Sequence, residues 1–141
     1  MAMEISSTLV ARLLNDARLS PAREVCGLLF GTAETIVSAQ PCPNVAPDPS
    51  RHFEIDPAAL FAAHRAARQG GPAVVGHYHS HPSGTATPSA RDAEGAMGDG
   101  ALWLIVTASD ARLWRTPSAG AFVPVDYVAV DKADRASAQA L

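Results

Sequence analysis

An apolar run at residues 73–78 leads directly into His-Ser-His-Pro at positions 79–82, and this feature constrains the chain most. The run predicts a buried strand. Pro82 ends this strand, and it also disfavours helical geometry at His81. Side chains two residues apart on a strand project from the same face. We therefore expect the imidazoles of His79 and His81 to point at one place, at the end of a strand.

His77 shares this face, so a three-histidine metal site has to be considered. The four residues from His77 to His81 span roughly 13 Å at ~3.3 Å per residue. Three imidazoles on one straight strand therefore cannot share a metal ion whose bonds are about 2 Å long. We expect His77 to lie below the site and a third ligand to come from another element.

Asp92 is the candidate for that third ligand. The 84–88 segment allows the chain to turn, and Ser89-x-x-Asp92 predicts a short helix to about Met97 with serine as its N-cap. Taken alone, this pattern more often marks a helix cap than a functional site. The two interpretations are compatible, because a serine hydroxyl can accept a backbone N–H and still donate its own proton into a cleft.

Two histidines and one aspartate leave the fourth position of a zinc ion open for water, which is typical of catalytic zinc. Zinc lowers the pKa of bound water to about 7, but a base is still needed to take the proton. Glu24 is the candidate, because it precedes an apolar strand predicted at residues 25–30. A carboxylate there is costly unless it faces solvent, a partner or a cleft. Without the histidines, an exposed position at the end of the strand is the favoured interpretation.

The remaining pattern predicts a single α/β (α+β) domain, with a mixed sheet and helices packed against it. Apolar residues near the N-terminus have helical spacing, and Ser6 or Ser7 can cap a first helix that runs to Ala17. Asp56-Pro57 opens a second helix that runs to Arg68. Strands are expected at residues 25–30, 36–37, 73–78, 102–107, 112–115 and 122–130, with an irregular loop at residues 41–49. We assign residues 1–130 to this domain and residues 131–141 to a polar tail.

Composition excludes several classes of protein. The net charge is −3 and the eleven Lys and Arg residues form no block, which argues against nucleic-acid binding. The apolar runs are too short for a membrane span, and the N-terminus lacks the basic segment of a signal peptide. Cys26 and Cys42 are too few for a disulfide framework, so we expect reduced, buried thiols. A soluble, cytoplasmic protein without nucleic-acid or membrane partners is expected.

The head of the first long strand and the histidine segment together resemble the JAMM (MPN-plus) family of metalloproteases. Glu24 is followed by Val-Cys-Gly-Leu-Leu-Phe-Gly, and His-Ser-His-Pro is followed by x6-Ser-x2-Asp, so every position of the family signature is present with its spacing. The 53–57 segment, Phe-Glu-Ile-Asp-Pro, is also similar to a family segment. Ten residues, 93–102, separate Asp92 from Trp103, and this short connection resembles the compact prokaryotic branch.

The resemblance implies a mixed sheet flanked by helices, a fold similar to that of cytidine deaminases. It implies that His79, His81 and Asp92 bind one zinc ion per chain. Glu24 would be the general acid and base, and Ser89 would donate a hydrogen bond to the oxyanion. The implied reaction is hydrolysis of a peptide or isopeptide bond next to the C-terminal glycine of a ubiquitin-like or sulfur-carrier protein.

Two other functions stay open at this point: a non-catalytic interaction module of the MPN type, and a metal hydrolase of small amides. The sequence does not distinguish linear from isopeptide cleavage, and it leaves a homodimer open. Arg51 and His52 precede the 53–57 segment and are candidates for the wall of a substrate groove. Trp103, Trp114 and Tyr127 lie in predicted strands and are expected in the core or half-buried in the sheet.

Overall fold

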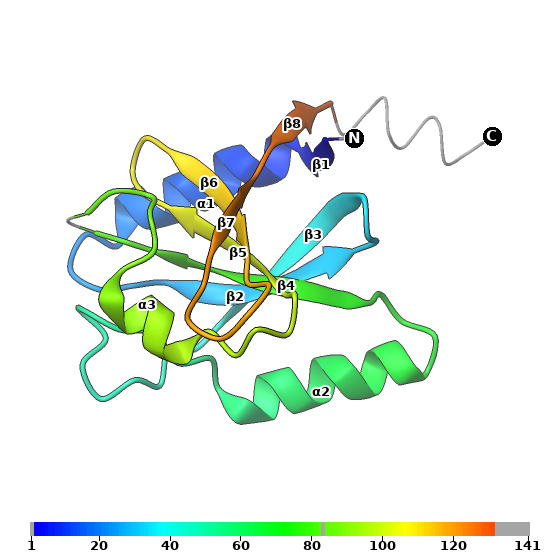
Figure 1. Cartoon of the computed structure of the whole chain (residues 1–141), viewed down its shortest axis with the longest axis horizontal. Helices are drawn as coiled ribbons and strands as arrows, with labels where there is room; N and C mark the ends of the chain where they lie inside the picture. Colours follow the sequence, from blue (N-terminus) through cyan, green and yellow to red (C-terminus); the bar gives the residue numbers. More distant parts are fainter. Residues whose placement is uncertain (1, 83, 132–141) are drawn as a thin grey trace.

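The computed structural model describes residues 2–82 and 84–131, which form an eight-stranded mixed sheet with helices on both faces (Figure 1). In chain order the elements are β1 Met3–Ser6, α1 Ser7–Leu19, β2 Cys26–Gly31, β3 Thr35–Cys42, α2 Pro57–Arg68, β4 Val74–Ser80, α3 Ala90–Gly95, β5 Leu102–Val106, β6 Ala111–Arg115, β7 Val123–Val125 and β8 Tyr127–Val130. The predicted fold class, a mixed sheet flanked by helices in one domain, is confirmed. Among the described residues, no helix has the length and apolar character needed to span a membrane.

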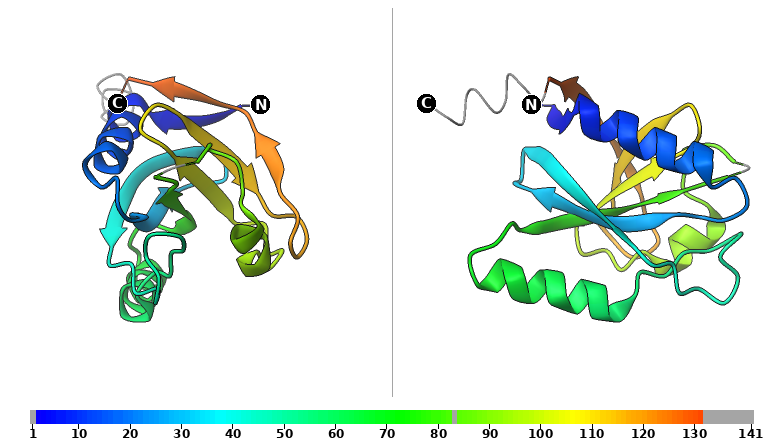
Figure 2. Two further views of the ribbon diagram at one scale, coloured as in Figure 1. Left: turned by 90° about the vertical axis from the view of Figure 1, so that its left-hand side faces the viewer. Right: turned by 180° about the vertical axis from the view of Figure 1, so that it is seen from behind.

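The strand that ends in the histidines lies in the middle of the sheet. The strand order is β7-β6-β5-β4-β2-β3-β1-β8, and β4 pairs with antiparallel β2 on one side and parallel β5 on the other. The sheet is strongly curled, as Figure 2 shows. Across the curl, the Tyr127 hydroxyl of β8 donates a hydrogen bond to the Ala111 carbonyl of β6 at 2.6 Å. Because both edges of β4 are paired, its backbone is a rigid support for side chains at its end.

The main core lies between α1 and the sheet. The buried residues of α1 recur every four positions and therefore share one face: they are Leu9, Leu13 and Ala17. They belong to one apolar cluster with strand residues such as Ile5 and Leu104. A smaller cluster of Leu28, Phe30 and Ala63 supports α2 on the opposite face, where α3 also lies (Figure 1). The histidines of β4 are on this second face, opposite the core that packs α1 against the sheet.

Three segments differ from the sequence-based expectation. Residues 3–6 form a strand rather than continuing helical spacing, because Met3 and Ile5 alternate with Glu4 at a period of two and pair in parallel with β3 and β8. The 122–130 segment, expected as one strand, is interrupted at Asp126 and supplies both edges of the sheet. β3 continues through residues 41 and 42, where the sequence predicts a loop. The predicted polar tail, apart from its first residue, lies outside the described residues.

Candidate metal centre

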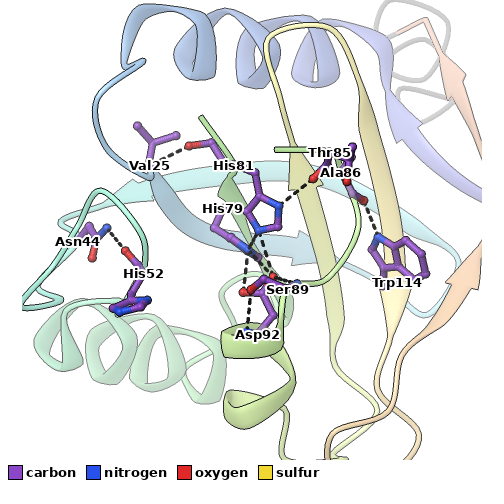
Figure 3. Close-up of polar contacts among 11 residues, drawn as sticks. Val25, Asn44, His52, His79, His81, Thr85, Ala86, Ser89, Asp92 and Trp114 are labelled. Atoms are coloured by element: carbon purple, nitrogen blue, oxygen red, sulfur yellow. Dashed lines mark hydrogen bonds and ion pairs between the residues drawn. The ribbon is translucent and has the colours of Figure 1, made fainter. Parts of the chain in front are cut away.

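Three side chains meet at the end of β4 (Figure 3). His79 lies in β4, which runs two residues beyond its predicted end, His81 follows the strand, and Asp92 comes from α3. The Nε2 atoms of His79 and His81 are 3.0 Å apart. Asp92 Oδ1 lies 3.1 Å from Nε2 of His79, and Asp92 Oδ2 lies 3.1 Å from Nε2 of His81. Ligand atoms around a tetrahedral ion with bonds of about 2 Å are roughly 3.3 Å apart. The three predicted residues therefore have the spacing of a metal site.

His81 is held in one tautomer. Its Nδ1 atom lies 2.8 Å from the Thr85 carbonyl oxygen, and because a carbonyl can only accept, Nδ1 must carry the hydrogen. In the neutral imidazole the Nε2 lone pair then faces the cluster. Trp114 steadies the same connection by donating a hydrogen bond to the Ala86 carbonyl at 3.0 Å (Figure 3). A ring nitrogen bonded to a backbone carbonyl is typical of metal-binding histidines.

The Asp92 carboxylate is both a helix cap and part of the cluster. Its Oδ2 atom accepts the Ser89 N–H at 2.9 Å, and the Ser89 hydroxyl accepts the Asp92 N–H at 3.0 Å, which completes the predicted capping box. Burial raises the pKa of Asp92, but hydrogen bonds with His79 and His81 outweigh burial and hold the pKa well below its usual range. Asp92 is therefore an anion at any physiological pH, as a metal ligand must be.

The His79 ring is fixed by packing. It is fully buried, and the Phe53 ring stacks on it with centroids 4.1 Å apart and planes 15° from parallel. Trp103 meets the same ring edge-on at 5.9 Å. The Nδ1 atom has no hydrogen-bond partner among the described residues. Burial lowers the pKa of His79, so the imidazole is neutral and its Nε2 atom can act as a ligand.

Glu24 is buried rather than exposed at the strand end, so the simpler interpretation of this residue is excluded. Its side chain is 6% exposed, and its Oε1 atom makes no hydrogen bond with any described residue. Burial raises the pKa of Glu24 to about 7; the charge of His81 lowers it, and that of Asp92 raises it further. A carboxyl group with a pKa near neutrality can accept and return a proton at the pH of the cell.

His77 lies outside the cluster, as its spacing predicts. Its ring packs against Trp103 with centroids 4.4 Å apart, and burial lowers its pKa to about 3, so it is a neutral packing residue. Cys26 is also inert: its thiol is buried, and burial raises its pKa to about 12. Both cysteines are free, although Cys42 is partly exposed rather than buried.

Two cavities lie near the site, and of these two only the first is lined by a residue of the cluster. One of about 610 Å³ lies between α3 and the 46–55 segment, and its lining includes Asp92, Phe53 and His52. The other, of about 570 Å³, is lined by Glu24, Asn44 and the end of α1. His52 lies in the wall of the first cavity, as the sequence predicts, whereas Arg51 is exposed and faces Asp48 at 4.0 Å. The first cavity therefore reaches the cluster at Asp92, and the second reaches Glu24.

Of the predicted aromatic residues, Trp103 is buried and Trp114 and Tyr127 are half-buried, as expected. The sequence does not identify two residues at the site. Phe53 belongs to the 53–57 segment that resembles the family, but its stacking on His79 follows from tertiary structure. Asn44 lies in the loop predicted at residues 41–49, and its neighbouring prolines are the main local sign of a structured turn.

These features define a class of protein: a compact α/β domain in which a central strand and a capped short helix present two histidines and an aspartate beside a buried glutamate. The chain belongs to the family of prokaryotic homologs of the JAB domain, whose model matches residues 6–117. The predicted compact prokaryotic branch of the JAMM family is thereby confirmed.

Similar proteins agree with this assignment. A desampylase of Haloferax volcanii is 36% identical over 115 residues, which cover 80% of this chain and 82% of the relative. A probable TtuB-protein conjugate cleaving protease of Thermus thermophilus is 40% identical over 82 residues, which cover 58% of this chain and 52% of the relative. A solved structure from Desulfitobacterium hafniense has the same fold, with a TM-score of 0.77 at 23% identity over 92% of this chain and 93% of that one.

Replacing Phe53 with leucine should weaken metal binding about three- to tenfold, because an aromatic pair contributes about 0.5–1.5 kcal/mol beyond its buried area. Zinc affinity measured by competition with a chromogenic chelator checks this. Phe61→Leu is the matched control, since Phe61 is 59% exposed on α2. Equal affinities of the two variants would show that stacking does not position His79.

Replacing Glu24 with glutamine should stabilise the metal-free protein at pH 8 but not at pH 4. Burial raises the folded-state pKa from 4.5 to about 7. Below pH 4.5 the carboxyl group is therefore neutral in the folded and the unfolded protein. As the pH rises from 4.5 through 7, ionisation lowers the free energy of unfolding of the wild type by up to about 3 kcal/mol. Urea unfolding with chelator at both pH values measures this. Glu54→Gln, an exposed carboxylate, is the control; a pH-independent effect of Glu24→Gln contradicts the assignment.

Proposed function

We propose that this protein is a zinc-dependent peptidase that hydrolyses a peptide or isopeptide bond next to the C-terminus of a ubiquitin-like or sulfur-carrier protein. The observation that carries the proposal is the convergence of His79, His81 and Asp92 at one point, in a family member whose buried Glu24 has a pKa of about 7. One relative is named a desampylase and another a probable protease of protein conjugates, which supports a protein conjugate as the substrate.

The residues present fit one zinc ion per chain. Zinc accepts imidazole nitrogen and carboxylate oxygen in tetrahedral geometry, and the His81 tautomer directs a lone pair at the cluster. Asp92 pairs with histidines and with no lysine or arginine among the described residues, so a metal ion can replace the proton of His81 as the partner of its buried negative charge. Zinc held by three protein ligands would supply Lewis acidity toward the scissile carbonyl and toward a water molecule.

Glu24 would take the proton of the attacking water and return it to the leaving amine. Its position favours both steps, because the carboxyl group is buried and its Oε1 atom is free of described partners. A pKa of about 7 means that little free energy separates its protonated and ionised forms at neutral pH.

Ser89 would stabilise the negative charge that develops on the carbonyl oxygen. Its hydroxyl accepts the Asp92 N–H, which leaves the hydroxyl proton without an acceptor among the described residues. The capping box also fixes the serine next to Asp92, so the donor is oriented before substrate binds.

The cavity beside Asp92 favours an extended polypeptide over a small amide. It has a volume of about 610 Å³, which is more than a short amide fills. The larger cavity has an apolar wall that includes Phe53, Ile55 and Trp103, against which side chains of an extended tail can pack.

A Glu24→Gln variant should keep one zinc ion per chain and lose at least about 100-fold in cleavage rate, which is the usual effect of removing a general acid–base group. The substrate is a ubiquitin-like protein whose C-terminal Gly-Gly is joined to the lysine of a fluorescent peptide. His79→Ala should lose zinc and activity together. Zinc-loaded Glu24→Gln with full activity would overturn the role of Glu24.

Wild-type protein that binds zinc and cleaves short amides but no ubiquitin-like conjugate would overturn the proposed substrate class. Failure to bind zinc at micromolar metal would instead favour a non-catalytic interaction module.

A further inference from the structure

Glu24 is held by its backbone on two sides. Its N–H donates to the Pro49 carbonyl at 2.7 Å, and its own carbonyl accepts a hydrogen bond from Asn44 Nδ2 at 2.9 Å. The next residue, Val25, donates its N–H to the Ser80 hydroxyl at 2.8 Å and accepts the Ser80 N–H at 2.9 Å (Figure 3). Ser80 lies between His79 and His81, so on one side the Glu24 segment is bonded to β4 itself. The other side is the loop of residues 43–56.

The carboxamide of Asn44 is the centre of that loop. Besides its bond to Glu24, Nδ2 donates to the His52 carbonyl at 2.9 Å. Its Oδ1 atom accepts the N–H groups of Ala46 and Glu54, both at 3.0 Å. Two donors and two acceptor positions are the full capacity of a primary amide, and all are used.

The partners of Asn44 connect the two halves of the site. His52 and Glu54 flank Phe53, whose ring stacks on His79, so the carboxamide holds the backbone on either side of that ring. The same Nδ2 atom holds the Glu24 carbonyl. One amide group therefore links the Glu24 backbone to the loop that places Phe53 against His79.

We infer that Asn44 is a positioning residue of the site, which acts through Glu24 by fixing its backbone relative to His79 and His81. The inference rests on the proposed function, because it assigns Asn44 a task only if Glu24 transfers protons. No other side-chain type offers two donors and two acceptors at this length, so aspartate lacks the donors and serine cannot reach all four partners.

The test is a double-mutant cycle of Asn44→Asp with Glu24→Gln, in which kcat and KM are measured on the Gly-Gly isopeptide substrate at saturating zinc. Asn44→Asp alone should lower kcat about 10- to 100-fold with little change in KM, since a displacement of about 1 Å can reduce a rate 100-fold. In the Glu24→Gln background it should have almost no further effect. Asn15→Asp is the matched control, because Asn15 is exposed on α1, and it should leave kcat unchanged.

Each outcome separates this inference from the proposed function. Equal losses in both backgrounds would show that Asn44 does not act through Glu24, which overturns the inference alone. Full activity of Glu24→Gln would overturn the proposed function first, and the inference with it. Asn44→Ser, which is uncharged and smaller, is the second variant if Asn44→Asp does not fold. If neither gives folded, zinc-loaded protein, Asn44 is a folding residue and the inference is wrong.

Discussion

The rest of the site depends on the contacts of the Asp92 carboxylate. This carboxylate closes the capping box of α3 and meets both imidazoles, so one side chain joins the end of β4 to the start of a helix only six residues long. A helix this short is not stable on its own in water. The cap and the contacts with His79 and His81 therefore hold α3 against the sheet, and the same atoms form the candidate metal site.

Burial explains how the charges of the site are arranged. It lowers the pKa of His79 and raises that of Glu24, so an imidazole stays neutral and a carboxyl group titrates near neutrality. Asp92 remains ionised because histidine hydrogen bonds outweigh the effect of burial. Burial lowers the pKa of His81, but its hydrogen bonds with Asp92 and the Thr85 carbonyl raise it overall, so in the metal-free site a proton on His81 accompanies the buried carboxylate. The fold thus favours a positive charge at the point where three ligand atoms converge.

The sequence predicts those parts of the site that depend on local spacing. His79 and His81 share a strand face, and Ser89 with Asp92 forms a cap, because strand and helix periods apply over a few residues. Glu24 is 55 positions from His79, and by its residue type alone it is indistinguishable from an exposed strand end. Its burial results from sheet pairing that brings the head of β2 beside the end of β4.

Other features depend on contacts that no local pattern encodes. Phe53 stacks on His79 of β4, and Asn44 bonds to Glu24, which precedes β2. A proline-rich loop does not reveal that one amide satisfies four backbone groups. β1 has four residues and is defined by pairing with β3 and β8. At Asp126 the chain passes from one edge of the curled sheet to the other. The alternation of residues along 122–130 does not show this change of edge.

X-ray absorption at the zinc K-edge of the zinc-loaded protein tests the central claim most directly. The account predicts two imidazole nitrogens at about 2.0–2.1 Å with the remaining ligands oxygen, and loss of one imidazole in a His81→Ala variant that still binds metal. A sulfur ligand at about 2.3 Å would place the zinc at Cys26 or Cys42. That result, or a spectrum unchanged by the loss of His81, would contradict the site described here.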